Sequence, residues 1–185
     1  MLVIGNGESR KDLNISKYTQ TKVGCNAVYR DFHIDHLICC DRRMVLEAQQ
    51  NNYDGIIYTR HDWVAQFTPA KVVPELPYCR GKTRLDDPWH WGSGPYAVLL
   101  GAQLSTDKVH MVGFDLYSTT ETVNNMYKGT DNYEGENTKP IDPAYWLYQI
   151  NKVFEHYPDI TFYNYNPEPW PTTWPNVQNL KLDAI

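Results

Sequence analysis

Residues 2–9 of the chain read Leu-Val-Ile-Gly-Asn-Gly-Glu-Ser, an apolar run that passes directly into a glycine-rich segment. This pattern predicts a buried first strand that ends in a tight turn. Glycines let a ligand approach the backbone of such a turn, whose N–H groups can face a nucleotide phosphate. An ordinary tight turn fits equally well, because Gly5-Asn6-Gly7 lacks the third glycine of the dinucleotide fingerprint and no Gly-Lys-Ser/Thr follows.

Apolar strand-like runs alternate with helical runs along the rest of the chain. Strands are expected at residues 2–4, 22–25, 36–40, 55–58, 109–112 and 160–163. Helices are expected at residues 42–50, 93–104 and 143–157. In the last helix an apolar stripe predicts core positions at Trp146, Ile150, Val153 and Tyr157. The alternation is typical of an α/β fold, with a mostly parallel sheet of about six or seven strands and helices on both faces.

The length of 185 residues predicts one domain that spans residues 1–185. Proline is frequent after residue 164, so residues 164–185 are expected to form an extended tail on the surface. Residues 118–141 are polar and form a connection that is long for a small domain. Such loops are usually functional or disordered.

The overall charge argues against nucleic-acid binding. The formal net charge is −5 and the sequence pI is about 5.6, whereas nucleic-acid binding needs a basic surface. No apolar stretch is long enough for a membrane span, and the N-terminus lacks the pattern of a secretory signal. The four cysteines show no Cys-x-x-Cys spacing and are interpreted as buried, reduced thiols, which favours a cytoplasmic location.

The chain is rich in aromatic residues, with 14 Tyr and 6 Trp. Many of them lie outside the expected strands. Sugar rings and nucleobases both stack on aromatic faces, so the composition suits a carbohydrate or nucleotide ligand. It suits an interface between copies of the chain in a homo-oligomer equally well.

Polar side chains stand at the ends of several expected strands and helices. Because the carboxyl ends of parallel strands lie along one edge of a sheet, we expect these side chains to converge on one crevice. They are Asn6, Asn26, Asp41, Ser93, Asp115 and Tyr117.

Four short segments at these ends form an ordered set of motifs. They are residues 5–9 (Gly-Asn-Gly-Glu-Ser), 24–29 (Gly-Cys-Asn-Ala-Val-Tyr), 93–96 (Ser-Gly-Pro-Tyr) and 113–117 (Gly-Phe-Asp-Leu-Tyr). Together they resemble the bacterial sialyltransferases of glycosyltransferase family 42 and related motility-associated and phage-borne glycosyltransferase domains. The family's corresponding motifs are Gly-Asn-Gly-Pro-Ser, Arg-Cys-Asn-x-Phe/Tyr, Ser-Gly-Val-Tyr and Gly-Ile-Asp-Phe-Tyr. Their order and approximate positions agree over most of residues 1–118.

The resemblance implies a single Rossmann-like domain that binds a CMP-activated sugar without metal or other cofactor and transfers the sugar to a glycan acceptor. By this likeness, Asn6 and Asn26 hold the nucleotide and phosphate, while Ser93 and Gly94 contact the donor. Tyr117 touches the departing phosphate, which amide, hydroxyl and phenol groups stabilise without adding negative charge. The expected nucleotide-binding residues are Gly5, Asn6, Gly7, Ser9, Asn26, Asp41, Ser93 and Gly94.

The expected catalytic residues are His90, Asp115 and Tyr117. The family's general-base His lies in the loop before the final helix, whereas residues 134–140 of this chain contain no His. His90 stands where the family has an Arg before Ser-Gly, and it can act as a general acid or base. Glu136 is a second candidate base. Asp115 is expected either to act in catalysis or to bond to the first-strand turn.

The missing loop histidine leaves two further functions open. One is a non-catalytic nucleotide- or sugar-binding protein on the same scaffold. The other is a metal-independent hydrolase or transferase of nucleotides that uses His90.

Overall fold

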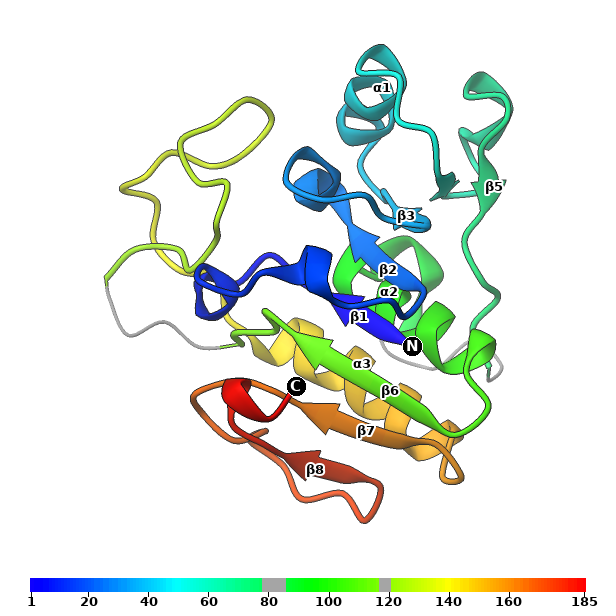
Figure 1. The fold of residues 1–185 in the computed structure, drawn as a ribbon. Helices are drawn as coiled ribbons and strands as arrows, with labels where there is room; N and C mark the ends of the chain where they lie inside the picture. Colours follow the sequence, from blue (N-terminus) through cyan, green and yellow to red (C-terminus); the bar gives the residue numbers. More distant parts are fainter. Residues whose placement is uncertain (78–85, 117–120) are drawn as a thin grey trace.

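The described residues form one sheet of eight strands, all of them parallel. The structure is a computed structural model, and it describes residues 1–77, 86–116 and 121–185. The strand order is β5-β4-β3-β2-β1-β6-β7-β8 (Figure 1). The strands are β1 (Leu2–Ile4), β2 (Lys22–Cys25), β3 (His36–Ile38), β4 (Ile56–Thr59), β5 (Lys71–Val72), β6 (Lys108–Val112), β7 (Thr161–Asn164) and β8 (Val177–Asn179).

The chain starts in the middle of the sheet and builds it outward in two directions. From β1 it proceeds through β2, β3 and β4 to β5 at one edge. It then returns through α2 (Ser93–Leu104) to β6, which lies beside β1, and continues to β7 and β8. The strands β1 and β6 are neighbours, but the chain continues from β1 toward one edge of the sheet and from β6 toward the other edge. This topology opens a crevice at the carboxyl ends of these two strands, the usual ligand site of such sheets.

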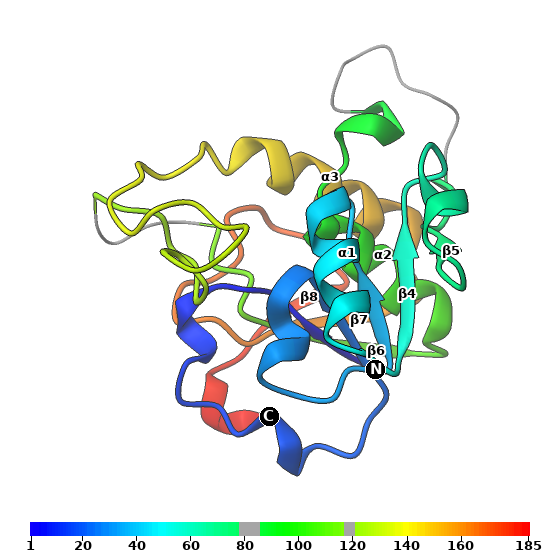
Figure 2. The same ribbon diagram turned by 90° about the horizontal axis from the view of Figure 1, so that it is seen from above.

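Helices cover both faces of the sheet, which confirms the predicted α/β class and is consistent with a Rossmann-like fold. Helices α2 and α3 (Ala144–His156) pack on one face, and α1 (Arg42–Gln50) packs on the other. Figure 2 shows α3 on the side of the molecule opposite the C-terminus. Helix α2 is central, because nine of its twelve residues are buried. A Cβ on Gly101 of this helix would lie 2.5 Å from Val3 Cγ2, so glycine allows α2 to approach β1 closely.

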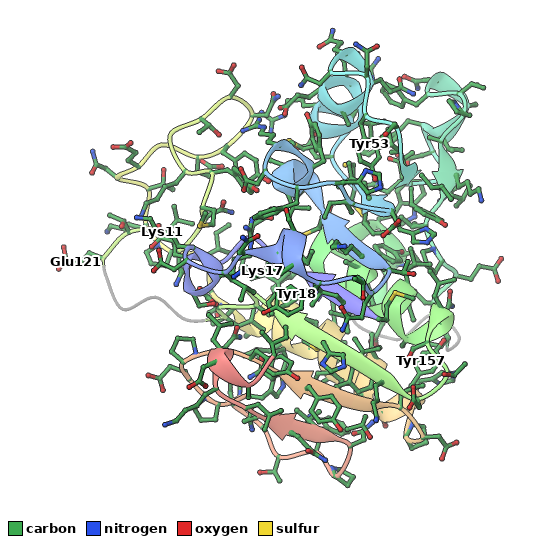
Figure 3. The ribbon with its side chains drawn as sticks, viewed as in Figure 1. Lys11, Lys17, Tyr18, Tyr53, Glu121 and Tyr157 are labelled. Atoms are coloured by element: carbon green, nitrogen blue, oxygen red, sulfur yellow. The ribbon has the colours of Figure 1, made fainter. Side chains whose placement is uncertain are left out.

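The connection from β6 to α3 passes over the carboxyl edge of the sheet. We call its described part, residues 121–143, the roof. In Figure 1 the roof is the yellow-green segment on the side toward which the arrows of β6 and β7 point, and Figure 3 labels its first residue, Glu121. The other connections contain the short 3-10 helices η1 (Glu8–Arg10), η2 (Ile15–Lys17), η3 (Asn26–Arg30), η4 (Val64–Gln66), η6 (Pro88–His90) and η7 (Leu182–Ala184).

The elements expected from the sequence all occur, with ends that differ by no more than about two residues, as is usual for element boundaries. Strand β3 ends earlier than expected because the backbone N–H of Cys40 donates to Ser93 Oγ (2.9 Å) instead of to a strand. Strands β5 and β8 were not expected. The second of these lies inside residues 164–185, so this segment is not only an extended tail: residues 177–179 complete the sheet beside β7.

No helix among the described residues is long and apolar enough to cross a membrane.

Candidate functional site

Two adjoining cavities lie at the carboxyl edge of the sheet, under the roof. The inner cavity has a volume of about 170 Å³ and the outer cavity a volume of about 530 Å³. They form one continuous cleft, because six residues line both of them. The shared residues are Asn26, Asp115, Leu116, Asn124, Asn125 and Trp146. The cleft therefore occupies the crevice that the strand topology opens between β1 and β6.

The Gly5-Asn6-Gly7 turn forms one wall of the inner cavity. A Cβ on Gly5 would lie 2.3 Å from the carbonyl oxygen of Gly113, and a Cβ on Gly7 would lie 2.4 Å from Cγ of Asp115. Both glycines thus allow the turn after β1 to pack against the turn after β6. Glycine is required at positions 5 and 7 because of this contact within the protein, whether or not a ligand also approaches the turn.

Asn6 and Asn26 line the inner cavity from the ends of β1 and β2. The Oδ1 atoms of both side chains are buried and have no hydrogen-bond partner in the described part of the chain. Asn26 also has a φ of 52°, in the left-handed region that few residues other than glycine adopt. A buried acceptor without a partner costs about 1–3 kcal/mol, which a ligand that donates hydrogen bonds would recover. These two oxygen atoms are therefore the clearest sign of a binding site.

The N-terminus of α2 forms another wall of the inner cavity through Ser93, Gly94 and Pro95. Ser93 Oγ accepts the hydrogen bond from the N–H of Cys40, which ties the helix start to the end of β3. The N–H groups of Ser93 and Gly94 lie in the first turn, where helix geometry provides no intrahelical acceptor. This end of the helix carries the positive side of its dipole, so it favours an anionic group in the inner cavity.

Asp115 lies between the two cavities and bonds to the first-strand turn. Its carboxylate accepts hydrogen bonds from the backbone N–H of Ser9 (2.7 Å), from the Ser9 hydroxyl group and from the Asn124 side chain. Burial raises the pKa of this carboxyl group, and the three hydrogen bonds act in the opposite direction. Of the two roles expected from the sequence, this geometry gives Asp115 the bond to the first-strand turn.

The other expected residues are spread more widely. Asp41 lies at the edge of the outer cavity, where it caps α1 by accepting from the N–H of Arg43 (3.0 Å) and pairs with the Arg43 guanidinium group. His90 lies in η6, and its side chain lines neither cavity. Its carbonyl oxygen accepts from Gln149 Nε2 (2.9 Å). Tyr117 lies outside the described residues. Glu136 lies on the roof and does not line the cleft.

Sequence reasoning missed the residues that the roof and α3 contribute to the cleft. The polar and aromatic ones among them are Asn124, Asn125, Lys128, Asn132, Tyr133, Glu134 and Trp146. The length and polarity of the loop pointed to this region but not to individual residues. Trp146 was expected in the core because it continues the apolar stripe of α3. It instead lies at the first turn of the helix, where the stripe passes beyond the sheet and meets the cleft.

Few charges are available inside the cleft. Among the described residues that line the inner cavity, Asp115 is the only acidic or basic side chain. The cations of the outer cavity are already paired, Arg43 with Asp41 (3.0 Å) and Lys128 with Glu8 (2.7 Å). Within the described ranges, no group of three or more His, Cys, Asp or Glu side chains is arranged to hold a metal ion. A ligand in the inner cavity would therefore be bound mainly by hydrogen bonds and by the dipole of α2.

Comparisons with protein families, with curated proteins and with solved structures found no match to this chain.

Proposed function

We propose that the protein is a glycosyltransferase that takes a sugar from a CMP-activated donor without a divalent metal ion, as the bacterial sialyltransferases do. The observation that carries this proposal is the pair of buried, unbonded Oδ1 atoms of Asn6 and Asn26 in the cleft between β1 and β6. Such acceptors suit the hydroxyl groups of a ribose and the amino group of a cytosine.

The two cavities suit the two parts of such a donor. In the proposed complex the nucleotide occupies the inner cavity, with its phosphate at the N–H groups of Ser93 and Gly94. The sugar and its acceptor then occupy the outer cavity, which is about three times larger (530 against 170 Å³). During transfer, negative charge builds up on the leaving phosphate. Fixed N–H and hydroxyl groups would stabilise that charge without having to reorganise.

A non-catalytic nucleotide- or sugar-binding protein is the second candidate, and one observation favours it. None of the described acid–base candidates expected from the sequence presents a base in the cleft, because Asp115 is engaged by Ser9 and Asn124, and His90 and Glu136 line neither cavity. The same cleft would then hold the nucleotide sugar without transferring it.

Calorimetric titration tests the proposal directly. The titrants are CMP, CDP, UMP, UDP, ADP and GDP, each with and without EDTA. We expect a preference for the cytidine nucleotides that survives chelation. Loss of binding with EDTA, or binding of purine nucleotides only, would contradict the proposal. Hydrolysis of CMP-sialic acid then separates the enzyme from the binding protein, since only the enzyme should consume this donor.

A matched pair of variants assigns the binding to the cleft. Asn26→Gly removes the buried acceptor at a backbone position (φ 52°) that glycine adopts freely. Asn52→Gly is its control, because Asn52 has nearly the same backbone conformation (φ 54°), is exposed and lines neither cavity. We expect only Asn26→Gly to weaken CMP binding, by about tenfold, the effect of one good hydrogen bond. Equal affinities in the two variants would place the ligand elsewhere.

A further inference from the structure

The roof is bonded to the first-strand turn at several points. The backbone N–H of Met126 donates to the carbonyl oxygen of Asn6 (2.8 Å). The backbone N–H of Glu8 donates to Asn124 Oδ1 (2.8 Å), and the buried Arg10 donates from its guanidinium group to the hydroxyl oxygen of Tyr127 (2.9 Å). These hydrogen bonds hold the roof over the cleft even when no ligand is bound.

One side chain of the roof connects the ends of two strands. The hydroxyl oxygen of Tyr133 accepts from Asn6 Nδ2 (2.9 Å) and from the backbone N–H of Ala27 (3.2 Å). Asn6 follows β1, and Ala27 follows β2 and the left-handed Asn26. A single phenol group thus spans the tips of neighbouring strands where they meet the inner cavity.

From this geometry we infer that Tyr133 is a positioning residue for the cleft: its hydroxyl group fixes the amide plane of Asn6 and thereby presents Asn6 Oδ1 to the ligand. The amide group is planar, so holding Nδ2 at Tyr133 also fixes the direction of Oδ1, the atom that is buried without a partner. If the amide of Asn6 could rotate freely, its Oδ1 atom would turn toward a hydrogen-bond donor. The identity of the ligand rests on the proposed function, whereas the orientation of Asn6 does not.

The surroundings of Tyr133 hold it in place for this role. Its ring packs against the Tyr127 ring, with centroids 5.5 Å apart, and the Arg30 guanidinium carbon lies 5.8 Å from its centroid. Asn132, with a φ of 65°, donates from Nδ2 to Glu47 Oε2 of α1 (2.7 Å). Burial raises the pKa of the Tyr133 phenol well above its usual range, so the group stays neutral. The contacts thus run from α1 through the roof to Asn6.

The test compares Tyr133→Phe with Tyr53→Phe. Each variant loses one hydroxyl group, and Tyr53 bonds to the carbonyl oxygen of Ile34 (2.6 Å), away from the roof (Figure 3). Amide hydrogen exchange is measured by NMR in the ligand-free proteins. In Tyr133→Phe, we expect exchange of the Asn6 side-chain amide protons and of the Ala27 N–H to become about tenfold faster. Exchange at Val153 in the core should change no more than in the control. Unchanged exchange at the Asn6 side-chain amide, or an equal change at Val153, would overturn the inference.

Titration with CMP adds a readout of orientation. We expect Tyr133→Phe to weaken CMP binding about tenfold, and to cause no further loss when Asn6 is already replaced in Asn6→Ala. A full second loss in the double variant would show that Tyr133 acts independently of Asn6. If the unmodified protein does not bind CMP, the proposed function fails, and the exchange of the Asn6 side-chain amide protons, which donate to Tyr133, still decides the role of Tyr133.

Discussion

Asp115 holds Ser9 through two hydrogen bonds, one from the backbone N–H at 2.7 Å and one from the hydroxyl group. Ser9 follows β1 and Asp115 follows β6, so the contact joins the two strands at which the chain reverses its direction through the sheet. Asn166 continues the connection to β7 by donating from Nδ2 to the carbonyl oxygen of Phe114 (2.7 Å). Hydrogen bonds therefore connect the segments that follow β1, β6 and β7 before any ligand binds.

Asp115→Ala should destabilise the protein by about 2 kcal/mol, because it leaves the partly buried N–H of Ser9 without an acceptor and leaves the Ser9 hydroxyl group only the longer contact to Asn166 Oδ1 (3.4 Å). Urea unfolding measures the loss. Asp12→Ala is the control, since Asp12 is exposed, and it should change the stability by no more than about 0.5 kcal/mol. A variant of unchanged stability that loses only turnover would instead identify Asp115 as a catalytic group.

Gly5→Ala should be far more costly than Gly94→Ala, although both positions line the inner cavity. The new Cβ at position 5 would lie 2.3 Å from a backbone oxygen, and such overpacking costs about 1–3 kcal/mol. At position 94 the nearest atom would be Phe114 Cε1 at 3.6 Å, an ordinary contact, and alanine favours a helix. Thermal melting should therefore show a clear loss for Gly5→Ala and little or none for Gly94→Ala. Equal losses would contradict this account.

The sequence was sufficient to predict the elements with strong apolar patterns. Helix α2 shows how well this works, because the glycines and serines at its ends and the apolar run between them define its limits. Strands β5 and β8 could not be predicted in the same way. They have two and three residues, and their mainly polar sequences, Lys-Val and Val-Gln-Asn, are held in place by pairing with β4 and β7.

The cleft could be predicted only in part. Residues at the ends of strands and helices can be predicted from the sequence, whereas contacts between residues far apart in the chain cannot. Asn6, Asn26 and Ser93 stand at strand and helix ends, so they could be predicted from topology. The bond between Asn6 and Tyr133 joins residues 127 positions apart, and no local pattern predicts it. The packing role of Gly5 likewise depends on Gly113, which becomes its neighbour only in the folded sheet.

Asn151→Ala should loosen residues 170–174 against α3, while Asn176 still holds the end of this segment by donating to the carbonyl oxygens of Phe154 and Tyr157. Asn151 Oδ1 accepts from Trp170 Nε1 (2.9 Å), Trp174 Nε1 (3.0 Å) and Thr172 Oγ1 (3.1 Å). Losing this shared acceptor should cost about 2 kcal/mol. Limited proteolysis should then cut residues 170–174 faster than in the unmodified protein. Glu155→Ala, which removes an exposed partner of Lys152 on the same helix, should leave the cleavage rate nearly unchanged. Equal cleavage in both variants would show that Asn151 does not hold this segment.

Glu47 on α1 should make the stability of the protein sensitive to acid. It accepts hydrogen bonds from Tyr29, from Arg30 and from Asn132 of the roof, each 2.7 Å long. Burial alone would raise the pKa of Glu47, but these hydrogen bonds outweigh it and hold the pKa below its ordinary value of 4.5. The folded state therefore binds this proton less tightly than the unfolded state. The stability that the ionised Glu47 contributes is complete above pH 4.5 and is lost as the pH falls through the lowered pKa.

Glu47→Gln should remove this dependence on pH. At pH 7 we expect the variant to be less stable by about 2 kcal/mol, because Arg30 loses a charged partner while one oxygen acceptor remains. The difference in unfolding free energy between the two proteins should shrink as the pH falls below 4.5, the ordinary value for a glutamate, since protonation then weakens the same contacts in the unmodified protein. Urea unfolding at a series of pH values measures this difference. A difference that stays constant down to about pH 3 would mean that Glu47 stabilises the protein through the packing of its side chain and not through its charge.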